Sequence, residues 1–211
     1  MGTNLREVWR TPRRWALRQQ ELATERRLRI DTAAERRSFR DDSQDRNSRY
    51  EPLTFDALEK ASSRLLLTPE DVVYDLGCGK GRVVCWFARQ PVKAVVGVEY
   101  DAALAEQARR NAVSMTDRRA PIEIRLADAA DLDYADASLV TLYNPFDAEV
   151  MERVLRRLSD SLDRAPRRLR IVYAAPRQAH VFQRFPHFRE VDRLSARYDL
   201  GEMALIFFES P

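Results

Sequence analysis

Three glycines within five residues form the stretch of this chain with the clearest chemical meaning. Gly77, Gly79 and Gly81 follow Asp75 closely, and an apolar run at 72–74 precedes them. The apolar run predicts a buried β-strand, and the apolar positions after Gly81 predict a helix that begins at once. Without a Cβ the turn lets the backbone approach a ligand closely, and the start of the helix presents unpaired N–H groups there. The stretch therefore indicates a ligand-binding turn between a strand and a helix.

The spacing of the glycines distinguishes between two kinds of ligand-binding turn. A dinucleotide-binding turn has glycine at the first, third and sixth positions, the last for close helix packing. Counted from Gly77 the sixth residue is Arg82, which disfavours a nicotinamide-dependent oxidoreductase. An acid two residues before alternating glycines resembles instead the first motif of class I S-adenosylmethionine-dependent methyltransferases. The resemblance implies that Gly77, Cys78 and Gly79 lie against the methionine part of the cofactor and that Asp75 holds its ammonium. The alternative is a turn with no ligand.

Two further strand ends complete the implied cofactor site. A β-branched strand expected at 94–100 contains Glu99, which the resemblance assigns to the ribose hydroxyls. A third strand, expected at 122–126, leads to Asp128, which the resemblance places near the adenine. Two more aspartates follow within five residues, and a turn acid with a structural role is the alternative. The predicted cofactor-binding residues are Asp75, Gly77, Cys78, Gly79, Arg82, Glu99, Tyr100, Asp128, Ala129 and Asn144.

Asn144-Pro145-Phe146 follows a fourth apolar strand, expected at 139–143. Ligands of open α/β sheets lie outside the carboxyl ends of the strands, so this tripeptide is expected to hold the group that is methylated. It resembles the Asn-Pro-Pro-aromatic motif of amino-group methyltransferases, in which the asparagine holds a planar amine and the aromatic ring stacks on it. One proline is missing here, which leaves the type of acceptor nitrogen open. The alternative is a strand-terminating turn with Phe146 in the core.

Tyr50-Glu51-Pro52 lies upstream of the glycine turn. It resembles an element of seven-strand protein-lysine methyltransferases, in which the tyrosine approaches the cofactor; the alternative is an ordinary half-buried tyrosine. The predicted catalytic residues are Tyr50, Asn144, Pro145 and Phe146. Methyl transfer from a sulfonium is an in-line displacement that depends mainly on positioning, which suits a chain without an evident acid–base pair.

The remaining reactive residues are few. Cys78 and Cys85 are expected to be packing residues in a reducing compartment. His180 and His187 are expected at the surface or in packing, and no cluster has metal-ligand spacing, so no metal is predicted. Without an apolar run near about 18 residues or an apolar signal core, a cytoplasmic protein with no membrane span is expected.

The amino-terminal quarter of the chain is rich in arginine. Residues 1–49 contain 13 arginines against 8 acidic residues, which leaves the rest of the chain nearly neutral within a net charge of +3. Helix formers throughout 3–49, with a break at Thr11-Pro12, predict a helical extension ahead of a catalytic domain at 50–211. Three interpretations stay open: helices that cover the cofactor cleft, a basic arm for an acidic partner, and a solvated extension.

The later pattern alternates strands and helices, which predicts a doubly wound α/β sheet in a single domain. Further helices are expected at 56–67, 102–114, 148–162 and 177–185, and strands at 169–174, 188–198 and 203–209. Asp101 directly precedes one of these helices and is expected to cap it. The resemblance adds a mainly parallel, seven-stranded, Rossmann-like order that ends in an antiparallel hairpin.

These observations predict an S-adenosylmethionine-dependent methyltransferase that releases S-adenosylhomocysteine. A protein or peptide amine ranks slightly ahead of a small-molecule acceptor, and nucleic acid ranks third, because acidic residues interleave with the arginines. The rival hypothesis is a non-catalytic, methyltransferase-like module that docks a partner through the arginine-rich helices. The oligomeric state stays open.

Overall fold

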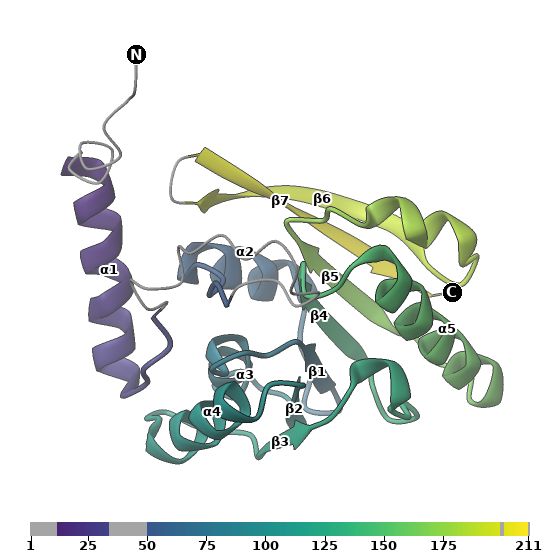
Figure 1. Cartoon of the computed structure of the whole chain (residues 1–211), viewed down its shortest axis with the longest axis horizontal. Helices are drawn as coiled ribbons and strands as arrows, with labels where there is room; N and C mark the ends of the chain where they lie inside the picture. The colour runs from purple at the N-terminus through teal and green to yellow at the C-terminus, as the bar shows by residue number, and fades with distance from the viewer. Residues whose placement is uncertain (1–11, 34–49, 199–200, 211) are drawn as a thin grey trace.

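The computed structural model describes residues 12–33, 50–198 and 201–210 (Figure 1). One seven-stranded sheet has the order β3-β2-β1-β4-β5-β7-β6. Its strands are β1 (Val72–Leu76), β2 (Ala94–Glu99), β3 (Ile122–Leu126), β4 (Leu139–Tyr143), β5 (Arg170–Ala174), β6 (Arg189–Tyr198) and β7 (Gly201–Glu209). The first five strands are parallel, and β7 pairs antiparallel with both β5 and β6. The predicted fold class is confirmed.

Helices cover both faces of the sheet. They are α1 (Pro12–Leu28), α2 (Phe55–Leu65), α3 (Arg82–Phe87), α4 (Ala102–Ser114) and α5 (Ala148–Arg164), with short 3₁₀ helices η2 (Ala129–Asp131) and η3 (Ala179–Arg184). One cluster of buried side chains includes residues of α2 and α3, and the other includes residues of α5 and η3. In α5 the buried apolar residues recur at helical spacing, at Met151, Val154, Leu155, Leu158 and Leu162. This is the two-sided covering that a mainly parallel sheet requires.

Several local expectations were wrong at the ends of elements. Within the described part of the helical region expected at 3–49, α1 stops at Leu28, because Arg29 adopts a left-handed backbone with φ of 56°. Residues 3–11 and 34–49 lie outside the described part. The helix expected at 56–67 ends at Leu65, because Leu66 is a left-handed C-cap and is 81% exposed. The segment expected as a helix at 177–185 forms the shorter η3.

The outer edge of β6 is occupied by side chains of α2 and its N-cap. Lys60 Nζ donates to the carbonyl of Ser195 at 2.9 Å, and Thr54 Oγ1 donates to the carbonyl of Arg197 at 2.9 Å. Asp56 accepts the backbone N–H of Arg197 at 2.8 Å. Backbone groups that would otherwise offer an open strand edge are thus satisfied within the chain.

No helix in the described ranges combines the length and the apolar character needed to cross a bilayer.

Candidate active site

The chain leaves β1 through a turn whose backbone favours glycine. Gly77 and Gly79 have φ of 75° and 53°, in the left-handed region that L side chains rarely adopt. The N–H groups of Gly77 and Cys78 both donate to the carbonyl of Val98 at 2.9 Å, which joins the turn to β2. The turn is therefore fixed at the carboxyl ends of two neighbouring strands.

Two of the predicted catalytic residues lie directly against this turn. A Cβ on Gly77 would come within 2.6 Å of Pro145 Cβ, and one on Gly79 would come within 2.3 Å of Tyr50 Cε2. Real Cβ atoms essentially never approach so closely, so both glycines are needed for packing inside the protein. The sequence interpretation weighed a ligand-binding turn against a turn with no ligand, and it did not anticipate this packing. The structure brings Tyr50 and Pro145 together with the glycine turn.

Asp75 carries a buried carboxyl group at the end of β1. Its Oδ1 accepts a hydrogen bond from Thr141 Oγ1 at 2.7 Å, whereas Oδ2 has no hydrogen-bond partner among the described residues. Burial raises the pKa of Asp75 to about 7; the bond from Thr141 opposes this shift and the charge of Glu99 adds to it. A cationic group beside Oδ2 would supply the missing partner. Sequence reasoning identified Asp75 but missed Thr141. Thr141 lies in β4, and no sequence pattern indicated that its hydroxyl contacts Asp75.

Glu99 accepts three backbone N–H groups at the end of β2. Its Oε2 accepts from Gly79 at 2.7 Å, and its Oε1 accepts from Tyr100 at 3.0 Å and from Asp101 at 2.9 Å. A carboxylate offers about four lone-pair directions, which leaves room for one more donor. Glu99 thus also anchors the glycine turn, a role that its sequence position did not reveal. The adjoining Tyr100 ring is 67% exposed. Asp101 caps α4 through its carboxylate, as expected.

Asp128 already has a local structural role. Its Oδ1 caps η2 by accepting the N–H of Ala130 at 2.8 Å, and its Oδ2 lies 3.7 Å from Arg153 Nη1. Ala129 is buried, and its carbonyl accepts from Tyr134 Oη at 2.5 Å. These contacts fit the alternative in which Asp128 is an acid with a structural role in a turn. Asp128 is half-buried and lies just beyond the carboxyl end of β3.

Asn144 follows β4 in a left-handed conformation with φ of 41°. Its Oδ1 accepts from Tyr173 Oη at 3.3 Å, and Tyr173 Oη accepts from the backbone N–H of Gln178 at 3.1 Å. Phe146 is partly buried against the core cluster of α5 and η3. Phe146 thus packs in part against the core, which is the alternative that the sequence left open for this residue. Sequence reasoning missed Tyr173, which reads only as an apolar strand residue.

Arg82 faces α1. It is 5% exposed, and its guanidinium pairs with Glu21 and Glu25 of α1, with Glu25 at 2.9 Å. It also donates to Thr32 Oγ1 at 2.8 Å and to the carbonyl of Leu53 at 3.1 Å. These contacts dock α1 on the start of α3. The predicted contact between Arg82 and the cofactor gains no support from them.

Residues 28–33, here called the N-terminal strap, continue from α1 past the glycine turn. Tyr50 Oη donates to the carbonyl of Thr32 at 2.6 Å, and Lys80 Nζ donates to that of Ala33 at 2.9 Å. Asn111 of α4 exchanges two hydrogen bonds with the backbone of Asp31, at 2.8 and 2.9 Å. These contacts attach the described amino-terminal residues to Tyr50, to the glycine turn and to α4.

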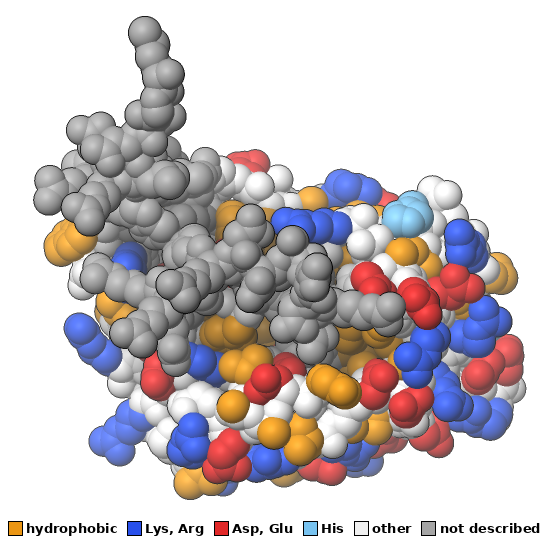
Figure 2. All heavy atoms as spheres, viewed as in Figure 1, with side chains coloured by type: hydrophobic (Ala, Val, Ile, Leu, Met, Phe, Trp, Pro, Cys, Tyr) orange, Lys and Arg blue, Asp and Glu red, His pale blue; other side chains and the backbone are white. Residues whose placement is uncertain are grey.

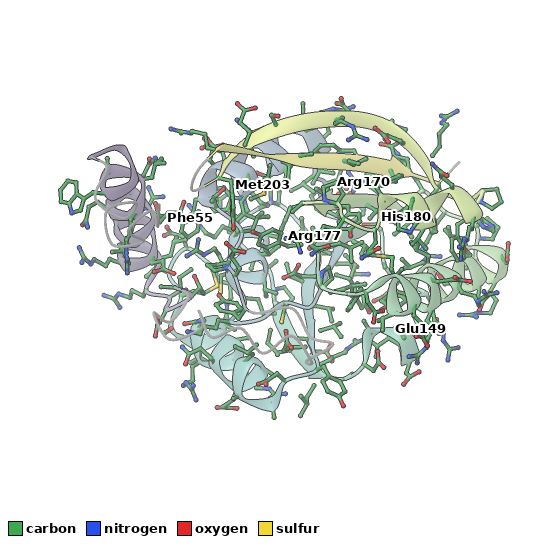
Figure 3. All side chains as sticks on the ribbon, turned by 45° about the horizontal axis from the view of Figure 1, so that its top comes forward. Phe55, Glu149, Arg170, Arg177, His180 and Met203 are labelled. Atoms are coloured by element: carbon green, nitrogen blue, oxygen red, sulfur yellow. The ribbon has the colours of Figure 1, made fainter. Side chains whose placement is uncertain are left out.

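The other reactive side chains are the two cysteines and the two histidines. Cys78 and Cys85 are buried free thiols. His187 Nε2 lies 3.0 Å from Asp163 Oδ1, and His180 is exposed on η3 (Figure 3). Within the ranges 12–33, 50–198 and 201–210, no group of three or more His, Cys, Asp or Glu side chains is placed to hold a metal ion.

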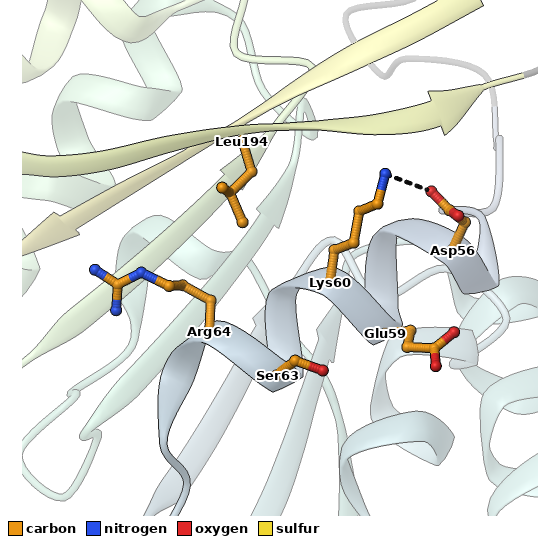
Figure 4. A pocket seen from close by; sticks show the side chains of 6 residues that line it. All are labelled: Asp56, Glu59, Lys60, Ser63, Arg64 and Leu194. Atoms are coloured by element: carbon orange, nitrogen blue, oxygen red, sulfur yellow. Dashed lines mark ion pairs between the residues drawn. The ribbon is translucent and has the colours of Figure 1, made fainter.

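A shallow hollow of about 430 Å³ lies between α2 and β6 (Figure 4). Its lining residues are Asp56, Glu59, Lys60, Ser63, Arg64 and Leu194. None of them is a predicted site residue, and Lys60 and Asp56 pair with each other across 3.2 Å. The hollow is therefore separate from the site at the strand ends.

Comparison with known proteins agrees with this geometry. Residues 73–165 match the family model described as a methyltransferase domain. No curated protein matches the chain in sequence.

Among solved structures, an RNA methyltransferase from Salinibacter ruber in complex with S-adenosyl-L-homocysteine is similar at 24% identity and a TM-score of 0.57, over 76% of this chain and 94% of that one. Magnesium protoporphyrin IX methyltransferase from Synechocystis PCC 6803, with bound SAM, is similar at 16% identity and 0.54, over 74% and 76%. The m1A22 tRNA methyltransferase TrmK from B. subtilis is similar at 12% identity and 0.57, over 73% and 65%. These likenesses show the fold.

Proposed function

We propose, on the premise that this chain is an S-adenosylmethionine-dependent methyltransferase of class I, that it methylates a nitrogen atom held beside Asn144, Pro145 and Phe146. The observation that carries this proposal is the packing of Pro145 on Gly77. Through this contact the loop after β4, to which we assign the acceptor, packs directly against the turn after β1, to which we assign the cofactor. Two reactants bound at these neighbouring segments would lie close together, which is what an in-line displacement requires.

The residues at the strand ends fit the cofactor. Asp75 offers its buried Oδ2 to the ammonium, and Glu99 keeps one lone-pair direction for a ribose hydroxyl. We assign the adenine to the exposed Tyr100 and to the loop at Asp128 and Ala129, because these residues follow the carboxyl ends of β2 and β3. S-adenosylmethionine supplies the methyl group on a sulfonium, and the residues of this chain bind and orient it.

The acceptor proposed is a protein or peptide amine, ahead of a small-molecule amine. Among the described residues, carboxylates lie at or just after the strand ends at Asp75, Glu99, Asp128, Asp147 and Glu149. The described cations near these ends are Lys80, Arg82, Arg153 and Arg177, and the Arg82 and Arg153 side chains pair with carboxylates (Figure 3). On the described surface in Figure 2, acidic and basic side chains are interspersed. Such a distribution favours a cationic or neutral amine over a phosphate backbone, which calls for a continuous basic surface.

The cofactor is tested by calorimetric titration of the full chain with S-adenosylmethionine, S-adenosylhomocysteine and NAD in parallel. Binding of the first two but not of NAD is expected. Glu99→Ala should weaken S-adenosylmethionine binding by roughly 1 to 3 kcal/mol, because ribose hydroxyls lose a buried partner. Glu123→Ala is the matched control, since Glu123 is exposed on β3 and pairs with Arg125. Equal affinity of the two variants for S-adenosylmethionine would contradict the assignment of Glu99 to the ribose hydroxyls.

The acceptor is tested with radiolabelled methyl groups offered to a peptide pool, to small primary and secondary amines and to transfer RNA. Label in peptides supports the proposal. Label in RNA alone would replace it with a nucleic-acid acceptor, in line with the substrates in the names of two similar structures. Cofactor binding without any label in these acceptors would favour the non-catalytic docking module.

We also place this activity in the cytoplasm. Cys78 and Cys85 are both buried as free thiols, which is the state expected in a reducing compartment. Localisation of a tagged full chain in its own cells would test this assignment, and a secreted or membrane-bound pool would contradict it.

A further inference from the structure

Gly79, in the middle of the glycine turn, is held by a carboxylate and by an aromatic ring. Its N–H donates to Glu99 Oε2 at 2.7 Å. The place that a Cβ would take is already occupied by Tyr50, because such an atom would lie 2.3 Å from Cε2 and 2.5 Å from Cδ2 of that ring. The backbone of Gly79 therefore has no room to move toward the ring, and the ring limits where the Gly79 N–H points.

The Gly79 N–H fixes one of the two oxygens of Glu99. Oε1 accepts from the N–H groups of Tyr100 and Asp101 at 3.0 and 2.9 Å, whereas Oε2 accepts from Gly79. A carboxylate that is already oriented loses less freedom when a ligand binds, which strengthens binding. The orientation of Glu99 thus depends on the place of the Tyr50 ring.

The place of the Tyr50 ring is set by the N-terminal strap. Burial raises the pKa of Tyr50, so its hydroxyl keeps the proton and donates to the carbonyl of Thr32 at 2.6 Å. Thr32 is itself buried and anchored to α1 and α3. Its N–H donates to Glu25 Oε1 at 3.0 Å, and its Oγ1 accepts from Arg82 Nε at 2.8 Å.

A buried amide in α4 ties the strap to the glycine turn a second time. Asn111 Oδ1 accepts the N–H of Asp31 at 2.8 Å, and Nδ2 donates to the carbonyl of Asp31 at 2.9 Å. The same Nδ2 donates to the carbonyl of Lys80, the residue after Gly79, at 2.8 Å. The strap therefore cannot shift relative to the turn without breaking hydrogen bonds of a buried side chain.

We propose that Tyr50 is a positioning residue for cofactor binding, through which the N-terminal strap keeps the Gly79 N–H on Glu99 and so orients the carboxylate for the ribose hydroxyls. This inference rests on the proposed function, because it uses the assignment of Glu99 to the ribose. The sequence resemblance implied a tyrosine that approaches the cofactor itself, whereas here Tyr50 acts through Gly79 and Glu99.

The first test is calorimetric titration of the full chain with S-adenosylhomocysteine. Tyr50→Phe keeps the ring but removes its bond to Thr32, so the dissociation constant should rise about threefold to tenfold, the range for one hydrogen bond. Tyr74→Phe is the matched control, because the Tyr74 hydroxyl donates to Asp136, in the loop before β4, at 2.9 Å. The control should bind like the wild-type chain. Wild-type affinity in Tyr50→Phe would overturn the inference.

A double-mutant cycle separates positioning from direct contact with the cofactor. In a Glu99→Ala background, Tyr50→Phe should have no further effect on the dissociation constant, because the group that it positions is gone. An equal loss in both backgrounds would overturn the inference and leave the role of Glu99 intact. Wild-type affinity in Glu99→Ala alone would instead remove the part of the proposed function on which the inference rests.

Hydrogen exchange gives a readout on the strap itself. If the strap strengthens cofactor binding, bound S-adenosylhomocysteine must stabilise the strap by the same factor. The N–H of Asp31, which donates to Asn111, should therefore exchange about threefold to tenfold more slowly with the ligand bound. The N–H of Arg197, which donates to Asp56 at the outer edge of β6, is the control and should not change. Unchanged exchange at Asp31 in the bound state would contradict the inference.

Discussion

At the scale of single residues, Asp75 combines burial with an unsatisfied oxygen. Thr141 satisfies one oxygen, and no described residue satisfies the other. Burial raises the pKa of this carboxyl to about 7, well above that of an Asp in the unfolded chain. Between about pH 4 and pH 7, Asp75 of the folded chain without a ligand therefore keeps a proton that Asp75 of the unfolded chain has released.

This difference predicts the pH dependence of stability. Because the folded pKa of Asp75 is the higher one, its contribution is present below about pH 4 and is lost as the pH rises through about 7. Urea unfolding between pH 5 and 8 should show a steeper fall in the free energy of unfolding for the wild-type chain than for Asp75→Asn. Parallel curves for the two proteins would contradict the assignment.

A second prediction concerns Gly79. Gly79→Ala places a methyl group against the Tyr50 ring and forces a non-glycine residue to φ of 53°, so it should destabilise the chain by several kcal/mol. Gly201→Ala is the matched control, because no atom lies within 4 Å of its added Cβ. Urea midpoints measure both. Similar small losses in the two variants would show that Tyr50 does not pack on the turn.

At the scale of elements, the docking of α1 depends on one buried cation. Arg82 starts α3, and its guanidinium lies 4.5 Å from the centre of the Phe55 ring at the start of α2. With Glu21 and Glu25 it joins three helices that are distant in sequence. This arrangement explains how a helix of weak amphipathic character is held beside the sheet.

Arg82→Met should therefore be strongly destabilising. It leaves Glu25, which is 5% exposed, without its ion-pair partner, and the expected loss is about 3 to 5 kcal/mol. Arg193→Met removes an exposed ion pair with Glu190 and should cost no more than about 1 kcal/mol. Replacing Glu25 by Gln in the Arg82→Met variant should restore part of the loss. Equal unfolding free energies for the two arginine variants would contradict this role.

The sequence predicted elements better than the contacts between them. The helix expected at 102–114 has those bounds, and Asp101 caps it, because capping and helical spacing are local signals. The partners of Arg82 lie in α1, nearly 60 residues earlier, and no local pattern links them. Thr141 and Tyr173 escaped notice for the same reason, since parallel strands bring their side chains beside Asp75 and Asn144 only after the sheet forms.

At the scale of the whole molecule, the strand order gathers the site. The order β3-β2-β1-β4-β5 places the carboxyl ends of five parallel strands along one edge, with the reversal of the chain between β1 and β4. The sequence analysis expected this topology, and from it the clustering of the residues at the strand ends. Contacts also cross the boundary expected at residue 49, because α1 pairs with Arg82 of α3 and the N-terminal strap is bound to Asn111 of α4.

We expect the amino-terminal region and the sheet to unfold together. The N-terminal strap is bound to Asn111 and Tyr50, and α1 to Arg82, so neither keeps its partners if the other opens. Calorimetry should show a single transition. Hydrogen exchange should protect the N–H of Ile30, which donates to the carbonyl of Glu25, about as well as the N–H groups of α3. A separate early transition would establish two independent units.

The contact between Pro145 and Gly77 also has an evolutionary consequence. Gly77 and Pro145 lie far apart in the sequence, yet a change at either position alters the space left for the other. A larger side chain at one position leaves less room at the other, so the two loops constrain each other's substitutions. Among homologues of this chain, changes at the two positions should therefore be found together.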